Sequence, residues 1–133
     1  MIKAKMATQL MVTVDNKIGA LSEVSGLLAE NGINLLAACG YITGPKGWLM
    51  FVCEDAQKAK DLLLAKQIEV REEEVILATL DNKPGALSDV AEKIATAGID
   101  ITLLYASAEK SARSSTVILI TENNKLALAV LKQ

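Results

Sequence analysis

A seven-residue string occurs twice in this chain, 66 positions apart. The first copy, residues 15–21, reads Asp-Asn-Lys-Ile-Gly-Ala-Leu, and the second copy, residues 81–87, differs only in having proline as its fourth residue. The spacing of 66 continues without a gap from Asp15 to Gly40, opposite Asp81 to Ala106. Internal similarity of this kind predicts two copies of one structural unit.

Each copy is predicted to begin with a strand followed by a helix. Residues 9–14 form an apolar, β-branched run that ends at the turn-forming pair Asp15-Asn16. After the string, apolar residues recur at helical spacing until a glycine supplies a left-handed stop at Gly32 and Gly98. Pro84 is expected at the first helical position of the second copy.

Two further strands and a second helix are predicted in each copy. The expected strands are residues 35–43 and 48–53 in the first copy and 101–106 and 116–121 in the second. The expected helices are residues 56–65 and 123–132. A longer connection in the second copy moves the spacing to 67, which predicts that Leu126, Ala129 and Val130 point inward in the last helix.

The fourth strand differs between the copies. Residues 68–70, extended toward Val75, suit a fourth strand of the first copy, whereas the sequence stops where the second copy would begin its own. Residues 2–6 alternate, and Ile2 lies 66 positions before Ile68. We therefore predict domains at 7–74 and 75–133 and hypothesise that residues 2–6 supply the missing strand. The alternatives are a frayed terminus and a strand from a neighbouring chain. The acidic residues 72–74 are expected to form a solvated linker.

Composition excludes several classes of function. A net charge of −2 and only four aromatic residues give little basis for binding nucleic acid. The chain has neither a run of about 18 apolar residues to cross a membrane nor a signal peptide, and its two cysteines lack metal or disulfide spacing, so a cytoplasmic protein is expected. Histidine is absent, and no metal-ligand cluster or phosphate-binding loop occurs. We therefore expect no cofactor and no enzymatic activity.

The element order βαββαβ, with Asp-Asn-Lys-x-Gly-Ala-Leu after the first strand and Gly-Ile-Asn or Gly-Ile-Asp before the second, resembles the ACT domain family. The resemblance implies an α+β fold: two ferredoxin-like units with antiparallel sheets covered by helices on one face. The chain is similar to a stand-alone tandem ACT protein without a catalytic domain. It is then expected to bind a small molecule, usually an amino acid, between units, as a homodimer or higher homo-oligomer, with a metabolic enzyme as a further partner.

The expected binding residues lie in the repeated string and where the second strand opens. Gly19 and Gly85 permit close backbone approach, and the helix starts offer amide groups to an α-carboxylate. Family resemblance adds Asn34 and Asp100, which would reach a ligand held by the neighbouring unit's loop. The full expected set is Asn16, Ile18, Gly19, Ala20, Leu21 and Asn34 in the first copy, and Asn82, Pro84, Gly85, Ala86, Leu87 and Asp100 in the second.

Asn16 is expected to pair with Asp100, and Asn82 with Asn34. Because a carboxylate favours a ligand ammonium, the Asn16/Asp100 site is expected to bind amino acids more tightly. Each residue also has a purely structural explanation: the asparagine amides can bond to their own turns, and Asp100 can be a solvated charge.

Two other classes of function stay open. The first is an assembly module that binds only protein partners through its ACT surfaces. The second is an enzyme of the acylphosphatase type, which would need a phosphate-binding loop with a well-placed arginine. The two arginines are Arg71, near the acidic run, and Arg113, in the long connection of the second copy.

Overall fold

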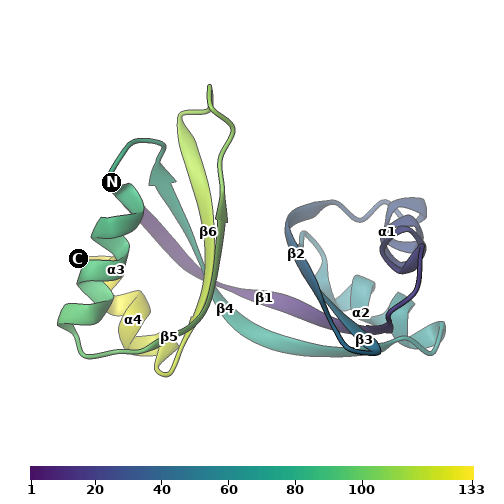
Figure 1. Ribbon diagram of the computed structural model, residues 1–133. Coiled ribbons are helices and arrows are strands. Elements are labelled where there is room, and N and C mark those ends of the chain that lie inside the picture. The colour runs from purple at the N-terminus through teal and green to yellow at the C-terminus, as the bar shows by residue number, and fades with distance from the viewer. The chain divides into compact units, whose positions relative to one another are not determined.

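A computed structural model describes residues 1–133 and contains six strands and four helices (Figure 1). In chain order, the elements are β1 (Ile2–Asp15), α1 (Ala20–Glu30), β2 (Leu35–Thr43), β3 (Lys46–Cys53), α2 (Ala56–Ala65), β4 (Glu69–Asp81), α3 (Ala86–Thr96), β5 (Ile101–Ser107), β6 (Ser114–Thr121) and α4 (Asn124–Leu131). The chain folds into two compact units. We call residues 8–73 the first unit and residues 1–7 with 74–133 the second unit.

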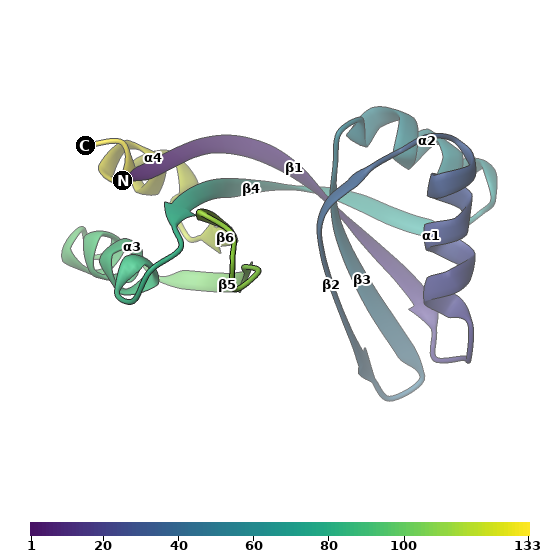
Figure 2. The same ribbon diagram turned by 90° about the horizontal axis from the view of Figure 1, so that it is seen from above.

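The first unit is a sheet with two helices on one face. Its strands are hydrogen-bonded in the order β2-β3-β1-β4, and β3 runs antiparallel to both β1 and β2. Helices α1 and α2 lie on the same side of these strands (Figure 2). The core between the layers joins Leu10 and Val12 of β1, Phe51 of β3, Leu28 of α1 and Leu63 of α2. Burial of these apolar side chains is what holds the helices on the sheet.

The second unit repeats this arrangement with the strand order β1-β4-β6-β5. Its core joins Ile76, Ala78 and Leu119 from the sheet to Val90 and Ile94 of α3. Even a local irregularity is repeated, because the β2–β3 register shifts between Leu35 and Ala37, and the β5–β6 register shifts between Ile101 and Leu103. The expected α+β fold of two ferredoxin-like units is thus confirmed.

The long strands β1 and β4 each contribute to both units. Alternate side chains of a strand point to the same face. In β1, the even-numbered residues Ile2, Ala4 and Met6 pack against the second core, whereas Leu10 and Val12 lie in the first. In β4, Val70 packs against the first core, and even-numbered residues from Ile76 to Leu80 lie in the second. One face of each strand therefore serves two cores in succession.

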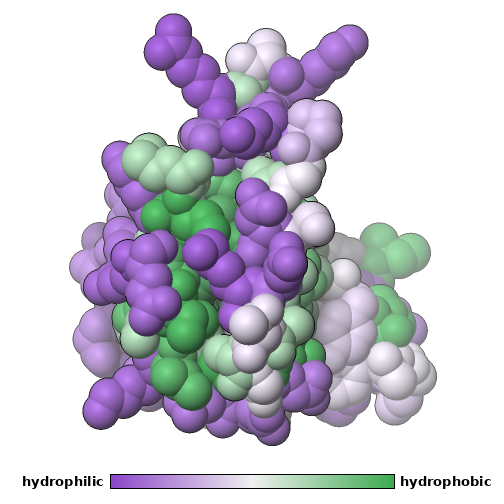
Figure 3. Space-filling model, turned by 90° about the vertical axis from the view of Figure 1, so that its left-hand side faces the viewer, coloured by the Kyte–Doolittle hydropathy of each residue, from purple (hydrophilic) through white to green (hydrophobic).

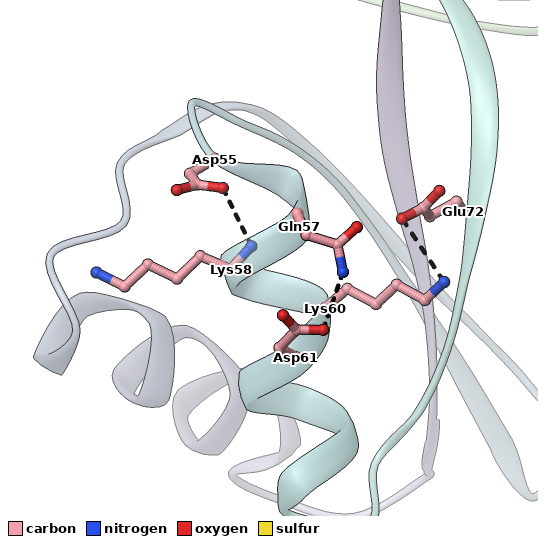
Figure 4. A network of polar contacts seen from close by, with 6 residues as sticks. All are labelled: Asp55, Gln57, Lys58, Lys60, Asp61 and Glu72. Atoms are coloured by element: carbon pink, nitrogen blue, oxygen red, sulfur yellow. Dashed lines mark hydrogen bonds and ion pairs between the residues drawn. The ribbon is translucent and has the colours of Figure 1, made fainter.

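The acidic residues 72–74 lie inside β4, so the prediction of a solvated linker is wrong. Two of the three carboxylates find partners within the first unit. Lys60 Nζ lies 3.6 Å from Glu72 Oε1 (Figure 4), and Gln9 Nε2 donates to Glu73 Oε1 at 3.2 Å. The acidic run is therefore part of a strand, and its side chains make specific contacts.

The spacing in the second half of each copy is 68, not 67. Val12 is opposite Leu49 and Ala78 is opposite Val117, so Leu49 and Val117 are equivalent (117 − 49 = 68). The longer connection in the second copy thus adds two residues, and every inward position of α4 moves by one. Ala127 and Leu131 are buried, whereas Leu126 is 43% exposed. The inward assignment of Leu126 and Ala129 is therefore wrong, and Val130 is only half-buried.

Several boundaries also differ from expectation. Helix α3 begins at Ala86 with Gly85 as its N-cap, so Pro84 precedes the helix rather than opening it. The β2–β3 turn is only Gly44-Pro45, because Lys46 already pairs with Thr43. The left-handed stops at Gly32 and Gly98, with φ of 71° and 73°, are confirmed. None of the four helices could span a membrane.

Candidate functional site

The two copies of the repeated string form nearly identical loops between a strand and a helix. Gly19 caps α1 with φ 90° and ψ 0°, and Gly85 caps α3 with φ 89° and ψ −12°. A side chain is strained in this left-handed region, which explains why glycine occupies both positions. Ile18 is fully exposed, and its counterpart Pro84 is also exposed. The fourth residue of the string therefore projects away from the core in both units.

The helix starts present free amide groups. The N–H of Ala20 donates to the carbonyl oxygen of Lys17 at 3.3 Å, and the N–H of Ala86 donates to that of Lys83 at 3.3 Å. The next two amides of each helix, at positions 21 and 22 and at 87 and 88, have no acceptor within the chain, and neither helix has a side-chain cap. Such unpaired donors, at the positive end of a helix, suit an anion.

The asparagine amides hold the neighbouring hairpins. Asn16 Nδ2 donates to the carbonyl oxygen of Gly44 at 3.1 Å. Asn82 Nδ2 donates to the carbonyl oxygens of Glu109 and Ala112, both at 2.9 Å. These bonds go to the hairpin turns rather than to the asparagines' own turns. The side-chain N–H groups of the two asparagines thus help to position the loops. The side-chain oxygen of each asparagine can still accept a hydrogen bond from a ligand.

The aspartate that opens each string is paired with an ammonium group. Lys46 Nζ lies 2.9 Å from Asp15 Oδ1, and this hydrogen bond lowers the pKa of Asp15 and raises that of Lys46. The amino group of Met1 lies 2.8 Å from Asp81 Oδ2 and lowers the pKa of Asp81 in the same way. Both aspartates are thereby stabilised as carboxylates.

Asn34 and Asp100 do not lie near the loop of their own unit. Within the first unit, Asp15 is opposite Lys46 at one end of β3, whereas Leu35 is opposite Cys53 at the other end. At about 3.3 Å per residue, this eight-residue strand separates the two ends by roughly 23 Å. The second unit repeats this pattern. A site that combines the loop with the residue opening the second strand therefore needs two units.

Two glutamates beside these strand-opening residues were not anticipated from the sequence. Asn34 Nδ2 lies 3.4 Å from Glu54 Oε1, and the N–H of Asp100 donates to Glu122 Oε1 at 3.1 Å. The backbone N–H of Glu54 also donates to the carbonyl oxygen of Asn34, and the N–H of Glu122 donates to that of Asp100. Glu54 and Glu122 lie 68 positions apart. Their repetition would have been visible with the correct spacing.

A pocket of about 240 Å³ adjoins the loop of the second unit. It is lined by three of the expected binding residues, Asn82, Ala86 and Leu87, and also by Lys83, Ser107 and Ser115. The two serines belong to β5 and β6 and were not anticipated, because a serine on a strand carries no distinctive signal. The structure contains no cluster of three or more His, Cys, Asp or Glu side chains that could hold a metal ion.

A larger open groove of about 730 Å³ lies on another side of the second unit, between α3 and α4. Figure 3 shows this side, where apolar side chains are bordered by hydrophilic ones. Ile2 and Val130 line the groove together with Asp89, Glu92 and Lys93. None of the expected binding residues lines it, so size alone does not make it the better candidate.

Comparison with known proteins supports the same fold. A family model described as an ACT domain pair matches residues 5–132. Among solved structures, protein BT0572 from Bacteroides thetaiotaomicron is 31% identical, with a TM-score of 0.90 over 97% of this chain and 88% of that protein. A search of curated proteins found no match.

Two more distant structures show the fold alone. The ligand-free regulatory subunit of aspartate kinase from Thermus thermophilus is 18% identical, with a TM-score of 0.68 over 99% of this chain and 95% of that subunit. Aspartokinase III of E. coli, in complex with lysine and aspartate, is 17% identical, with a TM-score of 0.58 over 98% of this chain and 31% of the enzyme.

Proposed function

Because this chain belongs to the family of ACT domain pairs, we propose that it is a regulatory protein that binds an amino acid and passes that signal to a metabolic enzyme. The observation that carries the proposal is the repeated loop. In both units, one loop contributes a left-handed glycine, two unpaired helix amides and an asparagine side-chain oxygen. An α-carboxylate fits the amides, and an α-ammonium fits the oxygen.

The residues that open the second strands give further support. Asn34 and Asp100 carry polar groups that can bind an ammonium, but each lies at the far end of its own sheet from the loop. We place the ligand at an interface between two ACT units, where the loop of one meets the strand opening of another. In this proposal the two units belong to different chains, so a homodimer or higher homo-oligomer is part of it.

The similar structures are consistent with an amino acid as the ligand. The Thermus thermophilus protein is a regulatory subunit of aspartate kinase, and the E. coli enzyme was crystallised with lysine and aspartate. We extend this chemistry to the present chain as a class of ligand only. The specific amino acid and the regulated enzyme are left to experiment.

A thermal-shift screen with each of the twenty amino acids tests the proposal. A ligand at a hundred times its Kd stabilises the folded state by about 2.7 kcal/mol, which is a measurable shift. Calorimetry then measures the affinity of the parent and of two loop variants, Asn16→Ala and Asn82→Ala, with Lys110→Ala as a surface control. Binding that weakens in a loop variant but not in the control supports the site. If no amino acid shifts the protein, the proposal fails and an assembly module without ligand is favoured.

A further inference from the structure

We propose that the outer face of the helix layer of the second unit is an interface between two copies of this chain. The face consists of the groove between α3 and α4 together with the exposed side of α4. None of the expected ligand-binding residues lines this groove, so the interface is additional to the one in the proposed function. An assembly that uses both interfaces is larger than a dimer.

Helix α4 is more apolar than its exposure in the chain requires. Six of its eight residues, from Leu126 to Leu131, are apolar, and Lys125 is its single charged residue. A helix that is hydrophobic all round is typically buried. Ala127 and Leu131 belong to the second core, but Leu126 is 43% exposed and Ala129 is also exposed. The unit therefore covers only part of the apolar surface of α4.

The equivalent helix of the first unit, α2, presents polar side chains instead. At the spacing of 68, Lys58 and Asp61 of α2 correspond to Leu126 and Ala129 of α4. Gln57 Nε2 donates to Asp61 Oδ1 at 2.9 Å on this face, and all three α2 side chains are exposed (Figure 4). The fold of one unit thus accommodates charged residues at these positions. The apolar residues of α4 need another explanation.

The groove extends this apolar surface toward α3. It has a volume of about 730 Å³, and its lining includes Ile2, Ala97 and Val130. Val130 lies four positions after Leu126, so the two side chains share one face of α4. Apolar side chains are bordered by hydrophilic ones on this side of the unit (Figure 3). Exposed apolar surface with a polar border is typical of a protein–protein interface.

The charges on this face favour a second copy as the occupant. The α3 side of the groove carries two carboxylates, Asp89 and Glu92, and one ammonium, Lys93. Helix α4 carries only the cation Lys125, and Lys132 follows it directly. None of these five side chains forms an ion pair within the chain. Two copies related by a two-fold axis along the helices bring α3 of each against α4 of the other, so opposite charges meet twice.

The first test gives α4 the polar residues of α2. The double variant Leu126→Lys/Ala129→Asp should raise the Kd of self-association by about tenfold or more, because the apolar contact is lost. The first unit has these residues at the equivalent positions, so the fold should tolerate them. Leu64→Lys is the matched control, since Leu64 is a leucine of α2 with a similar exposure of 49%. Sedimentation over a range of protein concentrations measures each Kd.

A charge exchange tests whether the occupant is a second copy. One variant, Asp89→Lys/Glu92→Lys, makes α3 basic, and another, Lys125→Glu/Lys132→Glu, makes α4 acidic. Each variant alone should self-associate more weakly than the parent, because like charges then face each other. An equal mixture of the two should associate again, since a basic α3 meets an acidic α4 and a basic α4 meets an acidic α3. Recovery on mixing also shows that both variants are folded.

Weaker association of the α4 double variant, unchanged association of Leu64→Lys and recovery in the mixture support the inference. Equal Kd values for the parent and the α4 double variant overturn it. Reversed-charge variants that do not recover on mixing also overturn it, because the face then serves another kind of occupant. A parent that stays monomeric overturns both this interface and the proposed homo-oligomer, whereas the thermal-shift screen still tests amino-acid binding by itself.

Discussion

The side-chain amide of Gln9 donates a hydrogen bond to the carboxylate of Glu73 across 3.2 Å. Gln9 is fully buried in β1, and the side chain of Glu73 is 23% exposed in β4. The bond therefore joins the two long strands at a position with little access to water. A hydrogen bond of this kind stabilises more than one at the surface, because water cannot readily replace the lost partner.

We expect Glu73→Ala to lower the free energy of unfolding by about 1–2 kcal/mol, since the amide of a buried glutamine loses a charged acceptor. Glu74→Ala is the matched control, because the Glu74 side chain is exposed and the charge change is the same. Urea denaturation of both variants measures the difference. Equal stabilities would show that the Gln9–Glu73 bond contributes nothing.

Leu131→Ala should destabilise the second unit by about 2–5 kcal/mol, because the side chain is almost fully buried against Ile94 and Leu119 in the core. Leu126→Ala should cost much less, since that side chain is 43% exposed. Thermal and urea denaturation of the two variants compare them directly. If Leu126→Ala were the more destabilising variant, α4 would have the orientation that the spacing of 67 predicts.

The repeat itself could be found from the sequence, whereas its offset could not. Identical residues recur often at the spacing of 66 from Thr13 and Thr79 to Ile33 and Ile99, and after the β2–β3 and β5–β6 hairpins few identities guide the alignment. Leucine, alanine and valine at adjacent positions of α4 allow more than one apolar stripe. Which of these side chains face the core depends on how α4 packs against β6, and the apolar pattern alone does not determine this.

Deletion of residues 1–6 tests the proposal that they complete the sheet of the second unit. We expect a lower thermal midpoint and lower solubility, because Ile2, Ala4 and Met6 would leave the second core and expose an edge of β4. Substitution of Lys3 and Lys5 by alanine is the control, since both side chains are exposed on the same strand. Unchanged stability and solubility after deletion would contradict the proposal.

The two cysteines should differ in reactivity. Burial raises the pKa of the Cys53 thiol, so iodoacetamide at pH 8 should modify the half-buried Cys39 first. The raised pKa also contributes stability that is complete below the unfolded-state value of about 8.5 and is lost as the pH rises through the folded-state pKa. Cys53→Ala should therefore reduce the loss of stability at alkaline pH. Mass spectrometry of the modified peptides and denaturation between pH 7 and pH 10 provide the two measurements.

The candidate site could be predicted in part. The loop residues at Asn16 and Asn82 were recognisable because the string is repeated and its glycines have a clear conformational reason. Glu54 and Glu122 were not recognisable, because they are equivalent only at the spacing of 68. That spacing depends on the register of the strands, which the string does not determine.

The shared face of β1 has a consequence for how the chain folds during synthesis. Ile2, Ala4 and Met6 are synthesised well before Leu131, yet all four residues belong to the second core. The first unit, residues 8–73, can form while residues 2–6 still lack their partners. Completion of the second unit must wait for Leu131, and contacts of such long sequence separation slow folding. The newly made protein therefore passes through a stage in which Ile2, Ala4 and Met6 are exposed, which is when a chaperone would be of most use.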